Sequence, residues 1–107
     1  MNPGKLRHRV TFLYLVEKEN EVGDTYFAEE PWETVWASVE PLRGREYYEA
    51  RKIQSESTHK ITIRYLPGVK PDMKIDFKGR TFEIEGPPIN PEERNRFLEL
   101  LCKEKEE

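Results

Sequence analysis

The sequence is short of cysteine and of long apolar runs, and each shortage excludes a class of protein. Cys102 is the one cysteine among 107 residues, so no intramolecular disulfide can form, and synthesis in a reducing cytoplasm is expected. No run of 18 apolar residues occurs, and the polar, basic start MNPGKLRHRV has no apolar segment behind it. We therefore expect neither a spanning helix nor a secretory signal peptide.

Residue patterns that carry chemistry are equally scarce. His8 and His59 have no cysteine or acidic residue at the spacing of metal ligands. The GxSxG, P-loop, GxGxxG, HExxH and CxxC patterns are all absent. The sequence thus predicts no catalytic residues, no metal site and no cofactor, and the protein is expected not to be an enzyme.

Charge is abundant and unevenly placed. Charged residues make up 36% of the chain, and the length fits one domain, residues 1–107, with a single small core. Between positions 17 and 33 seven acidic residues accompany a single lysine, whereas three basic residues cluster near the start. Opposite poles suit head-to-tail packing of identical subunits, although ordinary solvated charge is the alternative. The candidate interface charges are Lys5, Arg7, Arg9, Glu17, Glu19, Glu21 and Asp24.

Most of the chain alternates apolar and polar residues with the period of a β-strand. Strands are predicted over 10–16, 32–41, 59–66, 73–77, 81–85 and 97–104, and residues 17–24 are expected to form a polar loop. The predicted inward faces include Val35, Ala37 and Val39, then Ile61, Ile63 and Tyr65, then Leu98, Leu100 and Cys102. Lys78-Gly79 predicts a hairpin loop.

Residues after the fifth strand are less regular. Pro87 and Pro88 cannot continue a central strand, and 90–96 is predicted to be a turn or a single helical turn. LELLC is expected to be a strand, with a helix as the alternative. Six strands with short links predict an all-β fold, a small antiparallel barrel or sandwich, and closure into a barrel is favoured because it leaves no open edge.

Residues 43–57 fit neither a clean strand nor a clean helix. A helix over 45–54 has no apolar stripe, and a helix that short is marginal in water. The segment carries two tyrosines, Tyr47 and Tyr48, and four basic residues, Arg43, Arg45, Arg51 and Lys52, which suit an interface. We expect it to be poorly ordered in the free monomer; a surface helix at the barrel mouth is the alternative.

A small nucleic-acid-binding module of the OB type is the alternative function. Tyr47 and Tyr48 beside basic residues would suit base stacking and phosphate contacts. Glu46 and Glu49 offset part of the local positive charge, and the whole chain has a net charge of -3. Phosphate-driven binding needs several uncompensated positive charges, so this function is the weaker prediction.

The chain resembles the phage head-tail joining family, also called head-tail adaptors, head-closure or stopper proteins. The similarity is carried by GKLRHRV, VWASVEPLRGRE at 35–46, QSESTHKITIRYLPGV at 54–69, FEIE at 82–85 and LELLCKE at 98–104, in the same order along the chain. VWASVEPLRGRE is the most telling of these pieces.

The resemblance implies a compact β-barrel with a long loop between its second and third strands, here residues 43–57. It also implies a ring of copies below the portal and adaptor of a tailed phage, which retains packaged DNA and offers a platform for the tail. The loop is then expected to lie toward the ring axis, near DNA but without reading its sequence. Free chains are expected to be monomers, made in the bacterial cytoplasm and built into the virion.

Overall fold

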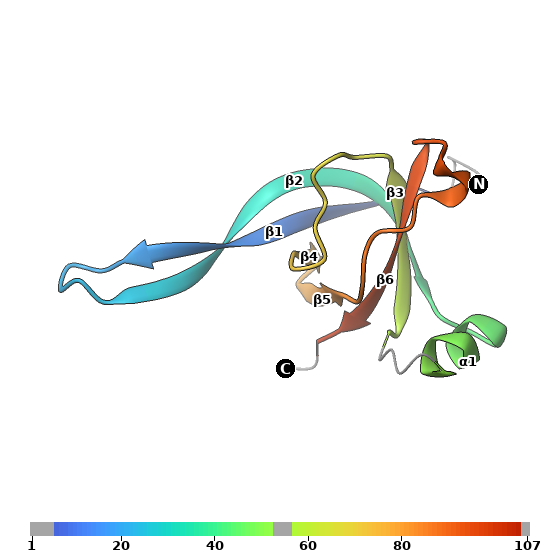
Figure 1. Cartoon of the computed structure of the whole chain (residues 1–107), viewed down its shortest axis with the longest axis horizontal. Helices are drawn as coiled ribbons and strands as arrows, with labels where there is room; N and C mark the ends of the chain where they lie inside the picture. The colour runs from blue at the N-terminus through green and yellow to red at the C-terminus, as the bar shows by residue number, and fades with distance from the viewer. Residues whose placement is uncertain (1–5, 53–56, 106–107) are drawn as a thin grey trace.

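The computed structural model describes residues 6–52 and 57–105. Along the chain lie β1 (His8–Glu19), β2 (Thr25–Pro41), α1 (Arg45–Lys52), β3 (His59–Arg64), β4 (Lys74–Phe77), β5 (Arg80–Ile84), the 3-10 turn η2 (Pro91–Glu93) and β6 (Phe97–Glu104). Figure 1 shows the strands gathered around one centre, with the β1–β2 hairpin reaching far to one side and α1 at the opposite end.

The strands close into an antiparallel barrel in the order β1-β2-β3-β6-β5-β4. Each neighbouring pair is antiparallel, and β1 closes the ring by pairing with β4 around Phe12 and Ile75. The predicted small antiparallel β fold is therefore confirmed, as is the strand, rather than helix, at β6.

Alternating side chains fill the barrel. Ile61, Ile63, Leu100 and Cys102 have no exposed surface, and Leu98 has 5%, so the inward faces predicted for β3 and β6 are confirmed apart from Tyr65. Tyr65 lies beyond the end of β3 and is 39% exposed. The other fully buried core side chains are Val10, Phe12, Ala37, Ile75 and Phe82.

The turn between β4 and β5 is the predicted hairpin. Both Lys78 and Gly79 have positive φ, 51° and 81°. Two successive residues with positive φ match the right-handed twist of the flanking strands, and glycine adopts such a conformation without steric cost.

The polar loop expected at 17–24 is confined to residues 20–24, because residues 17–19 belong to β1 and pair with β2. β1 and β2 stay in register from Leu13↔Pro31 to Glu19↔Thr25, and an ion pair joins Lys18 to Glu30 across the two strands. β2 pairs with β3 only from Ala37 to Pro41, so at Pro31 its one partner strand is β1. A proline is tolerated there because the other side of β2 needs no ladder hydrogen bond. We call residues 14–30 the arm.

The tip of the arm is held by one asparagine. The side-chain Oδ1 of Asn20 accepts hydrogen bonds from the backbone N–H groups of Val22 and Asp24, each at 3.0 Å. Asn20 N–H donates to the carbonyl of Asp24 at 2.9 Å, and Gly23 adopts a φ of 88°. The arm gives the described residues a longest dimension of 51 Å, against 28 and 26 Å for the other two.

Cys102 lies in the core between β3 and β5. Its burial raises the pKa of the thiol to about 12, so the thiolate that reacts with disulfide reagents is scarce at pH 8. We expect the folded chain to react with an aromatic disulfide reagent at least about a hundredfold more slowly than the urea-unfolded chain. Absorbance at pH 8 with and without urea measures both rates, and equal rates would contradict the burial of this thiol.

Candidate assembly surfaces

The chain between β2 and β3 leaves and returns to the barrel at one point. Leu42 N–H donates to the carbonyl of Thr58 at 2.9 Å, and Thr58 N–H donates to the carbonyl of Cys102 at 2.8 Å. Leu42 and Ser57 are both buried. These contacts clamp both ends of segment 43–57 to the end of the barrel.

Within this segment the structure contains a helix, so the expectation of a poorly ordered segment is wrong for residues 45–52. The helix α1 begins where Tyr48 N–H donates to the carbonyl of Gly44 at 3.2 Å. Arg51 lies over the ring of Tyr47, with its guanidinium carbon 4.4 Å from the ring centre, and its Nη1 donates to the carbonyl of Ser57 at 3.0 Å. A pair at spacing i, i+4 supports a helix even without an apolar stripe.

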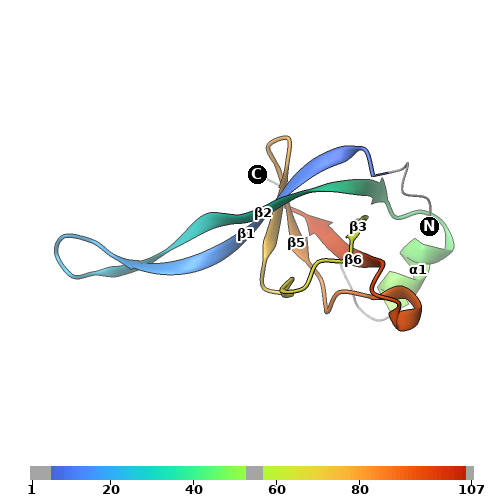
Figure 2. The same cartoon turned by 90° about the horizontal axis from the view of Figure 1, so that it is seen from above.

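The two tyrosines of α1 are turned to solvent rather than to the core. Tyr47 is 40% and Tyr48 68% exposed, and their rings meet edge to face at 5.8 Å. Figures 1 and 2 both place α1 beside the end of the barrel remote from the arm. The structure therefore brings Tyr47, Tyr48 and Arg51 together, while Arg43, Arg45 and Lys52 are exposed around them.

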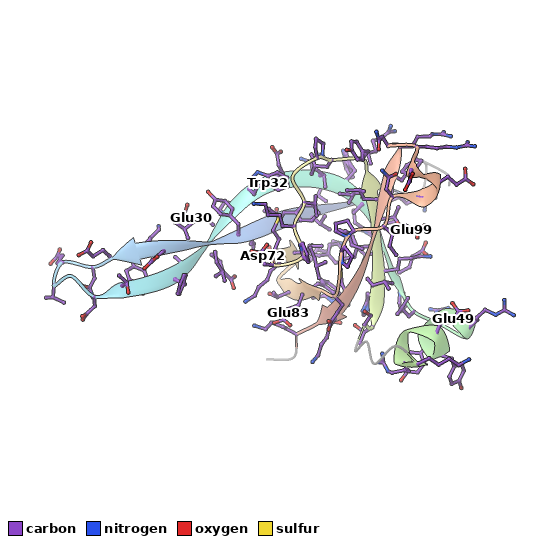
Figure 3. All side chains as sticks on the ribbon, in the orientation of Figure 1. Glu30, Trp32, Glu49, Asp72, Glu83 and Glu99 are labelled. Atoms are coloured by element: carbon purple, nitrogen blue, oxygen red, sulfur yellow. The ribbon has the colours of Figure 1, made fainter. Side chains whose placement is uncertain are left out.

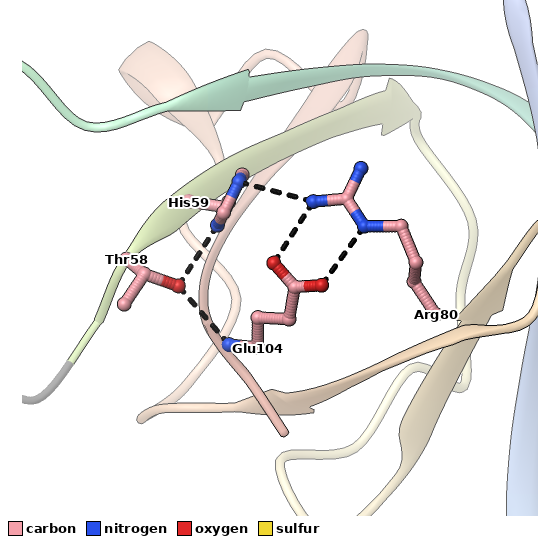
Figure 4. A network of polar contacts seen from close by, with 4 residues as sticks. All are labelled: Thr58, His59, Arg80 and Glu104. Carbon is pink, nitrogen blue, oxygen red and sulfur yellow. Dashed lines mark hydrogen bonds and ion pairs between the residues drawn. The ribbon is translucent and has the colours of Figure 1, made fainter. Parts of the chain in front are cut away.

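A polar network that sequence patterns did not predict lies next to the clamp (Figure 4). Arg80 Nε and Nη2 donate to the two carboxylate oxygens of Glu104, each at 2.9 Å. His59 Nδ1 lies 2.8 Å from the hydroxyl of Thr58, and that hydroxyl accepts from Glu104 N–H at 3.0 Å. The network joins the starts of β3 and β5 to the end of β6, so it holds the barrel end on which segment 43–57 is anchored.

Electrostatics at this network favour neutral histidine and charged carboxylate. The hydrogen bond from Arg80 lowers the pKa of Glu104. Burial lowers the pKa of His59 below its usual 6.5, and the nearby Glu104 only partly opposes this effect. Both shifts make the unfolded chain bind more protons than the folded chain, so acid destabilises the fold.

The free energy of unfolding is therefore expected to fall as the pH drops from 7.5 through 6.5 to 5.5, the range in which unfolded histidine takes up its proton. His59→Gln removes this titration, and His8→Gln is the matched control. We expect the loss on acidification to be smaller in the His59 variant than in the natural chain, by a modest amount because the site is only partly buried. Urea unfolding at each pH measures it, and an unchanged loss would contradict the assigned shift.

The two sets of candidate interface charges lie at opposite ends of the β1–β2 ribbon. Glu17 and Glu19 are on the arm strand, and Glu21 and Asp24 are at its tip. Arg9 lies inside β1 rather than before it, with its guanidinium carbon 5.0 Å from the ring centre of Trp36. Arg7 is exposed just before β1, and Lys5 lies outside the described residues.

Two further features bear on the kind of site. Within residues 6–52 and 57–105, no group of three or more histidine, cysteine or acidic side chains is placed to hold a metal ion. Over the same residues no helix has the length and apolarity needed to cross a membrane.

Comparisons with known proteins point to one family. A model of the phage head completion protein family matches residues 1–105. Head completion protein gp16 of Bacillus phage SPP1 is 29% identical over 82 residues, which cover 76% of this chain and 74% of that protein.

Two solved structures share the fold. The solution structure of protein SF1141 from Shigella flexneri 2a has a TM-score of 0.77 and 29% identity, covering 97% of this chain and 96% of the other. A chain from the virion of a native gene transfer agent particle has a TM-score of 0.60 and 16% identity, covering 94% and 96%, and shows likeness of fold alone. With the family model spanning nearly its whole length, the chain belongs to the phage head completion protein family and is a structural protein of the head-tail region of a phage virion.

Proposed function

We propose that copies of this chain form a ring at the head-tail interface, below the portal and adaptor. The ring closes the exit of the filled capsid, retains the packaged DNA and offers the surface to which the tail attaches. The observation that supports this most is segment 43–57, an element with two tyrosines and four basic residues whose two ends are clamped to one end of the barrel. Such an element can move toward a ring axis without disturbing the barrel.

The closing element in this proposal is α1 and its flanks. A helix of eight residues is marginal alone, and extended chain spans about 3.3 Å per residue against about 1.5 Å in a helix. Contacts between neighbouring copies can therefore stabilise an extended form of this segment, which reaches farther than the helix. The free-energy cost of unwinding the helix is modest. Tyr47 and Tyr48 supply apolar contact area, and the basic side chains face the DNA polyanion without reading its sequence.

Assembly on the portal-adaptor end explains how a monomeric chain becomes a ring. Each copy that binds the template raises the effective concentration of the next, so weak contacts between copies are sufficient. The cost of unwinding α1 and fixing the segment in a new conformation is offset by contacts repeated around the ring. In this scheme the chain is made in the host cytoplasm and joins heads already filled with DNA.

The decisive experiment is electron microscopy of particles from an induced producer strain that lacks the gene. We expect heads without DNA beside separate finished tails, and restoration of complete particles when the gene is supplied in trans. Quantifying DNA protected from nuclease in the same lysates checks retention independently. Normal numbers of infectious virions from the deletion strain would overturn the proposal.

A further inference from the structure

The arm carries large apolar side chains that the barrel does not cover. Leu15 is 52%, Phe27 70% and Val22 80% exposed. Leu15 is directly opposite Glu29 and Phe27 directly opposite Glu17, and residues opposite each other in a ladder share a face. We call Leu15, Glu17, Phe27 and Glu29 the outer arm face, which is both apolar and acidic.

The arm is built to project. Its tip is fixed by the Asn20 turn, and its base is tied to β4 by the ion pair between Lys74 Nζ and Glu29 Oε1 at 2.8 Å. Figure 3 shows side chains standing on both sides of the arm, well away from the barrel. A two-stranded hairpin alone is marginally stable in water, so exposed apolar residues on it are best explained by a surface that covers them in assembly.

A surface of complementary character lies at the other end of the same ribbon. Arg9 is directly opposite Trp36 and lies over its ring, and Trp36 is 51% exposed. Ala37 of β2 pairs with Ile63 of β3, and both face inward. Trp36 and Arg64 are the next residue on each strand, so they lie side by side on the outside of the barrel, where Arg64 is exposed. Arg9, Trp36 and Arg64 form what we call the basic platform on the outside of the barrel.

We propose that the outer arm face of one copy lies across the basic platform of the next copy. Phe27 and Leu15 then cover Trp36, and Glu17 meets Arg9 or Arg64, so charge and apolar surface match at once. The six strand residues from Tyr14 to Glu19 span about 20 Å at about 3.3 Å each, which is most of the 26 to 28 Å width of the molecule. This inference rests on the ring of the proposed function.

The occupant is a second copy because the chain carries both halves of the match at separate places. A contact between two different patches of one protein is heterologous, and repeating it gives a ring if the rotation closes. The arm is also strongly acidic, with six acidic residues and one lysine from Glu17 to Glu30. It therefore needs a basic receptor such as the platform rather than a second arm.

Cysteine cross-linking in assembled particles tests the contact. The chain with Phe27→Cys and Trp36→Cys replaces the natural one in a producer strain, and its only other thiol, Cys102, is buried. Mild oxidation of purified particles is expected to give a ladder of covalent multimers that extends beyond the dimer. The matched control is Tyr26→Cys with Trp36→Cys, because Tyr26 is the neighbouring residue on the opposite face of the arm and should cross-link at least about tenfold less.

Each outcome decides between the two proposals. A ladder with the Phe27 pair and not with the Tyr26 pair supports the arm contact. Three results would overturn the arm contact while electron microscopy still shows a ring. They are the absence of a ladder, a product that stops at the dimer, and a cross-link from the arm to an adaptor or tail protein. The proposed ring would stand in each case. Particles that hold the chain without any ring overturn both.

Charge exchange gives a second measurement that does not depend on cross-linking geometry. Glu17→Arg and Arg9→Glu are each expected to reduce complete particles by about tenfold or more through like-charge contact, and the double variant to recover most of the loss. All three chains should retain the unfolding midpoint of the natural chain, since both positions are exposed. Equal losses in the single and double variants would count against the contact.

Discussion

Heads assembled with the Tyr47→Ser, Tyr48→Ser chain are expected to lose their DNA although the chain still folds. The two rings touch each other edge to face and are 40% and 68% exposed, and neither belongs to the buried core, so their removal costs the barrel little. At a ring axis, buried tyrosines typically contribute about 2 kcal/mol each to an interface. Losing both tyrosines therefore costs about 4 kcal/mol per contact, a weakening of roughly 700-fold, and the ring repeats it in every copy.

Nuclease-protected DNA and infectious titre measure this effect, with incorporation of the variant into particles checked by immunoblot. Tyr26→Ser is the matched control, because it removes a comparably exposed tyrosine from the arm rather than from α1. A variant that fails to fold would show that the tyrosines belong to the core. A folded variant that is incorporated and retains DNA normally would show that α1 does not close the exit.

Phe12→Ala is expected to bring the barrel close to global unfolding. The Phe12 side chain has no exposed surface and meets Trp32 edge to face, with ring centres 6.1 Å apart. Deleting a buried phenylalanine ring costs about 3 to 5 kcal/mol, whereas small domains have only about 5 to 15 kcal/mol of stability in total. Urea titration followed by tryptophan fluorescence should show a much lower midpoint with an unchanged slope.

Phe27→Ala on the same hairpin is the matched control for this loss. Phe27 is 70% exposed, and substitutions at such sites usually change the free energy of unfolding by within about 0.5 kcal/mol. The contrast isolates burial, because both variants remove the same atoms from the same pair of strands. Similar midpoints for the two variants would contradict the position of Phe12 in the core.

The barrel was predictable where one face of a strand is buried. Ile61 and Ile63, like Leu98 and Leu100, alternate with polar residues because a one-residue slip would turn the apolar set to water. The order of the strands around the barrel was not predictable from such patterns, since pairs such as β1 with β4 join distant parts of the chain. The prediction that the sheet closes into a barrel rested instead on the general disadvantage of unpaired strand edges.

Residues 14–16 of the arm were predicted as strand, but the rest of the arm was missed because neither of its faces contacts the core. Its strands carry glutamate and lysine where buried strands carry valine and isoleucine, so the pattern is typical of a loop. The arm is stabilised instead by cross-strand pairing, as between Lys18 and Glu30, and by the Asn20 turn. Neither leaves an alternation of apolar and polar residues in the sequence. The strand β2, Thr25–Pro41, likewise continues through Pro31 because it pairs with β1 there, not because it has a buried face.

The helix α1 was predicted only as the alternative to a poorly ordered segment, and the polar network was missed, for different reasons. Sequence periodicity identifies helices that bury a stripe, whereas α1 depends on the Tyr47–Arg51 pair and on the clamp at Leu42. The network joins His59, Arg80 and Glu104 from three strands, and no spacing in the sequence marks residues that meet only after the barrel closes. The role of α1 as an interface element stays a prediction.

The clamp between Leu42 and Thr58 has a consequence for how such a protein can diverge. A segment whose ends are joined by the barrel itself can gain or lose residues at small cost, since doubling a loop adds only about 0.6 kcal/mol of closure entropy. Changes at the exposed positions of this segment leave the packing of the barrel untouched, whereas Ser57 is fully buried. The length of this segment is therefore free to follow the bore of whatever assembly the chain enters, while the scaffold is inherited unchanged.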